Sequence, residues 1–76
     1  MNSNDIARLL NEALPGARID VRGDGGKFEV EVVSPAFDGL NRVKRQQAVY
    51  RILNEHISTG AIHAVSMILK SPAEAA

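Results

Sequence analysis

The chain has 76 residues, of which 45% are apolar and 24% charged, and its formal net charge at pH 7 is zero. This length allows one small domain with one core, so we expect no enzyme with a buried multistep site and no small-molecule substrate. Cysteine is absent, which excludes disulfides and thiolate chemistry, and the balanced charge argues against strong, general nucleic-acid binding.

The first residues, Met1-Asn2-Ser3-Asn4-Asp5, lack the basic and apolar regions of a signal peptide. No apolar run in the chain approaches the roughly 20 residues that span a bilayer. We therefore expect a cytoplasmic protein without membrane contact.

A first helix is predicted directly after this start. Ser3 is a candidate N-cap, and Pro15-Gly16 is a helix breaker. The apolar residues between them recur at helical spacing and share one arc. This arc consists of Ile6, Leu9, Leu10, Ala13 and Leu14.

Two half-buried strands are predicted on either side of Gly23-Asp24-Gly25-Gly26, because apolar and charged residues alternate there. The turn matches the G-x-x-G pattern of RNA-binding KH domains. In those domains the loop joins two helices, whereas here it joins two strands, so we interpret it as a hairpin turn. Ser34-Pro35 ends the second strand, since proline has no amide hydrogen to donate. The inward-facing strand residues are Ile19, Val21, Phe28, Val30 and Val32.

A longer helix is predicted from Asn41, its N-cap, to the stop at Ser58-Thr59-Gly60, after a turn or short helix over residues 37–40. Gln46 falls within its apolar arc, so either this side chain is hydrogen-bonded in the core or the face meets solvent. We expect Tyr50 to pack in the core. The apolar arc consists of Val43, Val49, Tyr50, Leu53 and Ile57.

Residues 63–70 are predicted to form a third strand, which Ser71-Pro72 ends. A strand-helix-strand connection of this length favours parallel pairing of the second and third strands. The expected fold is an α+β two-layer sandwich of α-β-β-α-β order, with two helices on one face of a three-stranded mixed sheet and an extra short helix left open. Residues 1–72 would form the domain and residues 73–76 a short flexible tail.

Positive charge is concentrated on the long helix. Four of the nine basic residues fall within ten positions, Arg42, Lys44, Arg45 and Arg51, and no acidic residue occurs between Asp38 and Glu55. On a helical wheel Lys44 and Arg51 lie opposite the apolar arc, whereas Arg42 and Arg45 flank it. These two patches suit either an acidic protein partner or weak, salt-dependent contact with phosphates.

His63 is the main candidate for metal chemistry. Neutral imidazole binds iron or zinc, and a residue at the mouth of an edge strand can project toward a partner. Judged from the residues alone, a structural or solvated histidine is the more common explanation, because a lone histidine has no ligand spacing. We interpret His56 as a solvated histidine that interacts with the dipole of the long helix.

Three segments in the second half of the chain, Arg42-Val43-Lys44, Val49-Tyr50 and Ile62-His63-Ala64-Val65-Ser66, resemble the BolA family, specifically its short acid-stress-type branch. The resemblance covers nearly the whole chain and implies the KH-like BolA fold. It also implies that His63 helps to ligate a [2Fe-2S] cluster shared with a monothiol glutaredoxin and glutathione, with no intrinsic cofactor. The expected role is a non-enzymatic adaptor in iron-sulfur cluster trafficking or iron regulation, docked through the basic residues of the helix.

The hairpin departs from the family pattern. Related proteins often carry a cysteine or histidine in this loop as a second ligand, where this chain has Gly26 and Lys27. Glycine has no side chain and a lysine ammonium is a poor ligand at neutral pH. Either the cluster is held differently or weakly, or the pair forms without one. The alternative function is a nucleic-acid-binding transcriptional regulator that contacts phosphates through Arg42, Lys44, Arg45 and Arg51.

Overall fold

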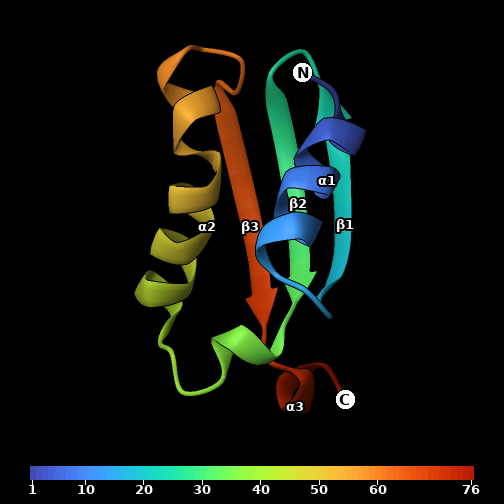
Figure 1. Ribbon diagram of the computed structural model, residues 1–76, viewed down its shortest axis with the longest axis vertical. Coiled ribbons are helices and arrows are strands. Elements are labelled where there is room, and N and C mark those ends of the chain that lie inside the picture. The colour runs from blue at the N-terminus through green and yellow to red at the C-terminus, as the bar shows by residue number, and fades with distance from the viewer.

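A computed structural model describes all 76 residues and arranges them as a layer of helices against a sheet (Figure 1). The expected α-β-β-α-β order is confirmed, with short helical turns before the second long helix and after the third strand. The elements are α1 (Ser3–Ala13), β1 (Arg18–Asp24), β2 (Lys27–Val33), the 3-10 helix η1 (Pro35–Phe37), α2 (Arg42–Ser58), β3 (Ala64–Lys70) and α3 (Pro72–Ala75). None of the helices combines the length and apolar character needed to cross a membrane.

The sheet is mixed, as predicted, with strand order β1-β2-β3. β1 and β2 pair antiparallel with Asp24 opposite Lys27, which leaves Gly25 and Gly26 as a two-residue turn. Both glycines have positive φ, 59° and 81°, the geometry that two-residue hairpin turns require. β2 and β3 pair in parallel, from Lys27 opposite Ala64 to Val33 opposite Lys70. β3 therefore forms one edge of the sheet.

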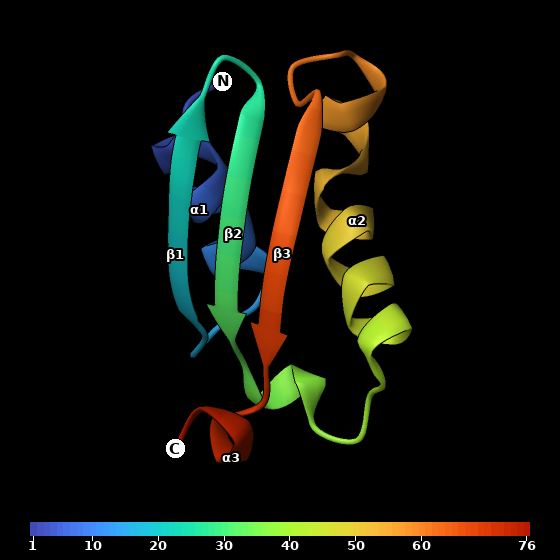
Figure 2. The ribbon, with the colours of Figure 1, turned by 180° about the vertical axis from the view of Figure 1, so that it is seen from behind.

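Both long helices cover the same face of the sheet. In the view from behind, the sheet lies in front of α1 while α2 runs alongside β3 (Figure 2). Alternation along each strand directs mostly apolar residues to this face and mostly polar residues to the opposite one, where Val33, Ala64 and Ile68 are the apolar exceptions. The buried core consists of Ile6, Leu10, Phe28, Val30, Val32, Phe37, Val49, Leu53 and Ile62.

Helix α2 buries a narrower stripe than its apolar arc predicts. Val49 and Leu53 are fully buried, but Val43 is 59% exposed and Tyr50 is 43% exposed. The prediction that Tyr50 packs in the core is therefore wrong. Because α2 runs alongside the edge strand β3, only part of its circumference faces the rest of the domain. Gln46 is half-buried near the exposed Val43, so the face meets solvent at this end of the helix.

The first helix and the turn before α2 begin earlier than predicted. Asn2, not Ser3, is the N-cap of α1, because its side chain accepts from the Asp5 amide at 2.9 Å while the Asp5 carboxylate accepts from the Asn2 amide at 3.0 Å. This reciprocal pair is a capping box. The short helix expected over residues 37–40 lies instead at η1, where the Ser34 hydroxyl accepts from the Ala36 amide at 3.1 Å.

The C-terminal residues are helical where a tail was predicted, because α3 extends to Ala75. Ser71 is its N-cap, Pro72 occupies the first turn, and Glu74 completes a second capping box with Ser71. Proline is favoured in a first turn because its missing N–H has no helical partner there. One helical turn thus closes the domain beyond residue 72.

Candidate functional site

His63 lies at the end of the sheet where the β1–β2 turn meets the start of β3. Ile62, only 2% exposed, anchors the preceding position in the core. The His63 amide donates to the Gly26 carbonyl at 2.7 Å, and the Ala64 amide donates to the same oxygen at 3.1 Å. The backbone is thereby fixed on both sides of His63 while the residue itself remains exposed. β3 begins at Ala64, one residue later than predicted.

Gly26 packs directly against the imidazole of His63. A Cβ atom built on Gly26 would lie 3.1 Å from Cγ of His63, closer than an ordinary van der Waals contact. The φ of +81° disfavours any residue with a side chain at this position as well. Gly26 therefore supplies a carbonyl and space for the ring, and no ligand. Lys27, the other residue where a loop ligand was considered, is exposed at the first position of β2.

The chain does not complete a metal site by itself. No group of three or more histidine, cysteine, aspartate or glutamate side chains converges in the structure. His56 lies in the last turn of α2, as predicted, but it is half-buried rather than fully solvated, and its carbonyl accepts from the Ile62 amide at 3.0 Å. His63 can therefore offer an imidazole ligand, but the chain gathers no complete ligand set around it.

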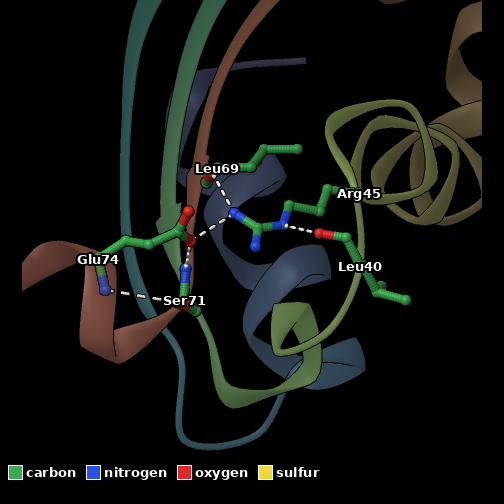
Figure 3. A network of polar contacts seen from close by, with 5 residues as sticks. All are labelled: Leu40, Arg45, Leu69, Ser71 and Glu74. Carbon is green, nitrogen blue, oxygen red and sulfur yellow. Dashed lines mark hydrogen bonds and ion pairs between the residues drawn. The ribbon is translucent and has the colours of Figure 1, made fainter.

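Arg45 does not belong to the exposed basic surface on which it was predicted to dock a partner. Its side chain is 13% exposed and lies within an internal network (Figure 3). Nε donates to the Leu40 carbonyl at 2.8 Å, while Nη1 donates to the Leu69 carbonyl at 3.2 Å and to Glu74 Oε1 at 2.6 Å. The guanidinium carbon also lies 6.0 Å from the centre of the Phe37 ring. Arg45 therefore ties α2 to β3 and α3.

Glu74 is the other end of this network. Its Oε1 accepts from the Ser71 amide at 2.7 Å as well as from Arg45. The Ser71 amide and then the Arg45 guanidinium stabilise the ionised form and lower the pKa of Glu74 to about 2. The sequence analysis missed this residue, although Ser71-Pro72-Ala73-Glu74 fits the S-x-x-E pattern of a capping box.

Arg42, Lys44 and Arg51 are exposed and form no ion pair. Lys44 and Arg51 are seven residues apart on α2 and share one face. The 17 residues of α2 extend over about 25 Å. Arg42 and Lys44 lie at its first turn, whereas His63 follows the loop at its far end, so Arg51 is the basic residue of this group nearest to His63 in the fold.

Replacing Arg45 with methionine should lower the free energy of unfolding by about 2 kcal/mol, since hydrogen bonds from a charged donor contribute roughly 1.5–3 kcal/mol. Arg42→Met is the matched control, because Arg42 is on the same helix and carries the same charge but is exposed and unpaired. We expect the control to change stability by less than about 0.5 kcal/mol. Urea denaturation measures both values. Equal losses in the two variants would show that the Arg45 network contributes nothing specific.

The low pKa of Glu74 predicts a pH dependence of stability. A carboxyl whose pKa is lower in the folded than in the unfolded state stabilises the fold above its usual pKa of 4.5, and this contribution disappears as the pH falls toward about 2. Urea midpoints of the unmodified chain and of Glu74→Gln should therefore differ above pH 5 and converge near pH 2. A difference that is constant across this range would contradict the assignment.

Comparisons with known proteins extend over nearly the whole chain. The family described as BolA-like protein matches residues 6–74. The acid stress protein IbaG of Escherichia coli K12 is 46% identical over 74 residues, which are 97% of this chain and 88% of that protein. A bolA protein homologue from Coxiella burnetii superimposes with a TM-score of 0.86 at 32% identity, covering 99% of this chain and 96% of the other. The BolA domain of SufE1 from Arabidopsis thaliana gives a TM-score of 0.84 at 30% identity, covering 95% and 93%.

Proposed function

The chain belongs to the BolA family, and from this premise we propose that it is a non-enzymatic adaptor that pairs with a monothiol glutaredoxin in iron-sulfur cluster trafficking or iron regulation. The observation that carries the proposal is the position of His63. The amides of His63 and Ala64 both donate to the Gly26 carbonyl, and the imidazole packs beside Gly26, which has no side chain to displace it. A ligand of this kind is prepared for a partner without rearrangement of the fold.

In this proposal His63 contributes one ligand to a [2Fe-2S] cluster, and the glutaredoxin and glutathione contribute the others. Replacement of thiolate by imidazole raises the reduction potential of such a cluster, as in Rieske-type centres. The absence of a second ligand at Gly26 or Lys27 means that this chain holds its side of the cluster with a single bond. A cluster held in this way is suited to transfer rather than to storage.

The proposed docking surface combines His63 with the exposed basic face of α2. Arg51 lies on this face nearer to His63, and Lys44 extends the same face toward the start of the helix. Neither side chain forms an ion pair, so both can meet an acidic or glutathione-bearing partner. Arg45 is not part of this surface, because its largely buried side chain is paired with Glu74.

The test is anaerobic cluster reconstitution with a monothiol glutaredoxin and glutathione, followed by visible circular dichroism with and without this chain. We expect a spectrum distinct from that of the glutaredoxin homodimer. An unchanged spectrum would reject cluster sharing. Size-exclusion chromatography of the same samples separates the two remaining cases, an adaptor that docks without a cluster and a chain that does not pair with glutaredoxin.

A second candidate function, nucleic-acid binding, is favoured by one observation on α2. Tyr50 is 43% exposed and lines a shallow hollow with Gln47, Arg51 and Asn54. An exposed aromatic ring beside an arginine is an arrangement on which a base can stack while the cation contacts the backbone. This favours single-stranded over duplex nucleic acid.

If this second function holds, the double variant Lys44→Glu/Arg51→Glu should lose retention on immobilised single-stranded DNA near physiological salt. The loss is expected because phosphate contacts supply most of such affinity. Arg18→Glu/Lys27→Glu makes the same change of charge on the strands of the hairpin and should retain binding. Equal losses in both double variants would indicate attraction by overall charge rather than a site on α2.

A further inference from the structure

The outer edge of β3 presents backbone groups that the chain itself does not use. The Ala64 amide donates to the Gly26 carbonyl, and the Lys70 carbonyl accepts from the Ser34 amide. The even-numbered residues of β3 therefore direct their backbone N–H and C=O groups toward β2. In a parallel pair, alternate residues direct both their N–H and C=O groups to the same side. Val65, Met67 and Leu69 therefore direct theirs away from the sheet.

One contact confirms this direction. The Leu69 carbonyl accepts from Arg45 Nη1 at 3.2 Å, which places it on the side of α2. Neither the turn and loop hydrogen bonds nor the side-chain hydrogen bonds of the chain involve the backbone of Val65 or Met67. Arg45 thus covers the last part of the edge and leaves the middle of the strand unpaired. Unpaired strand edges are templates for the addition of another strand.

A groove of about 460 Å³ lies along this edge, between β3 and the first turns of α2. Arg42 and Gln46 line its helical side, and Met67, Ile68 and Lys70 line its strand side. Ile68 is 43% exposed. Arg42 and Lys70 have no ion-pair partner, whereas Arg45 is neutralised by Glu74. The groove therefore combines unpaired backbone groups, an exposed apolar side chain and net positive charge.

We propose that this groove docks an extended acidic segment of a partner protein, which adds to β3 as a short fourth strand. Main-chain hydrogen bonds to Met67 and its neighbours would supply affinity, as in other cases of strand addition. Acidic side chains on one face of the docked strand would face Arg42 on the helical side, and apolar side chains on its other face would lie beside Ile68, with Lys70 adding positive charge at the end of the groove. Four residues of β3, from Met67 to Lys70, line the groove, so the docked stretch is about as long.

The groove favours a peptide over a nucleic acid. The edge offers both N–H donors and C=O acceptors, which an extended peptide matches in full and a phosphate backbone, having only acceptors, does not. No aromatic residue lines the groove on which a base could stack, since Tyr50 lines a separate hollow. The groove is lined by the last four residues of β3, whereas His63 precedes the first residue of the strand, so this site is independent of the cluster proposal.

Fluorescence anisotropy tests the proposal with a labelled octapeptide of alternating glutamate and valine. We expect saturable binding of this probe, and at least tenfold weaker binding of the lysine-valine peptide. Methylation of the valine amides blocks one edge of the probe, and methylation of the glutamate amides blocks the other. One methylated probe should lose at least tenfold in affinity and the other should not. Unchanged binding of both methylated probes would overturn strand addition.

Two charge variants locate the site on the protein. Arg42→Glu should weaken binding of the glutamate-valine probe at least tenfold, whereas Lys44→Glu, the same charge change two residues later on α2, should not. His63→Ala should bind the probe unchanged, which separates this proposal from the cluster. Two results together would assign the groove to nucleic acid instead. The glutamate-valine probe would not bind, and an oligonucleotide would bind the unmodified chain but not Arg42→Glu.

Discussion

Replacing His63 with alanine is expected to abolish the visible circular dichroism spectrum that this chain and a monothiol glutaredoxin produce together. No group of three or more histidine, cysteine or carboxylate side chains is gathered around His63. Gly26, the residue in contact with the ring, has no side chain. Because this chain contributes one ligand in the proposed complex, its loss should return the spectrum to that of the glutaredoxin homodimer.

The fold should not change in this variant, because His63 is exposed and its backbone contacts do not depend on the imidazole. The thermal midpoint should shift by no more than about 4 °C, as for a neutral surface substitution. His56→Ala is the matched control, since it removes the other histidine and should leave the spectrum intact. A heterodimer spectrum that survives in His63→Ala would remove His63 from the proposed mechanism.

The hairpin and the parallel pairing were predictable from the sequence because they depend on local patterns. Alternation on either side of the turn assigns each strand residue to one face, and Gly25-Gly26 provides the positive φ angles that the turn needs. The helix between the second and third strands then favours the parallel arrangement that the structure contains. Both features can be derived without knowledge of long-range contacts.

The burial of α2 was not predictable in the same way. Its apolar arc shows which side of the helix faces inward, but the pattern does not show how far along the sheet edge the helix lies. That position depends on the segment that joins β2 to α2, in which Phe37 is fully buried. Val43 and Tyr50 therefore belong to the arc and yet are exposed.

The candidate site was also predicted only in part, because some of its contacts join residues that are far apart in the sequence. The place of His63 follows from its neighbours, because a buried Ile62 and an extended backbone turn the next residue outward. The role of Arg45 depends on Glu74, 29 residues further along the chain. Sequence spacing on one helix carries no information about such a partner, and Arg45 was consequently assigned to the surface.

Phe37→Ala should cause the largest loss of stability among the changes considered for this chain. Phe37 is fully buried in the core, and the guanidinium of Arg45 lies near its ring. Truncation of a buried phenylalanine costs about 3–5 kcal/mol, since both the apolar transfer energy and the cavity contribute. A domain of 76 residues has a total free energy of unfolding of about 4–11 kcal/mol at 0.05–0.15 kcal/mol per residue. The loss is therefore a large fraction of the total, and the variant should unfold at a much lower urea concentration than the unmodified chain.

Val43→Ala is the control for this prediction, because the sequence pattern assigns Val43 to the core while the structure leaves it 59% exposed. Its urea midpoint should stay close to that of the unmodified chain, with a change below about 0.5 kcal/mol. A large loss in Val43→Ala would mean that the first turn of α2 packs more closely on the sheet than the structure shows. A small loss in Phe37→Ala would mean that the segment between β2 and α2 can move without disturbing the core. The Arg45 network could then not depend on the packing of Phe37.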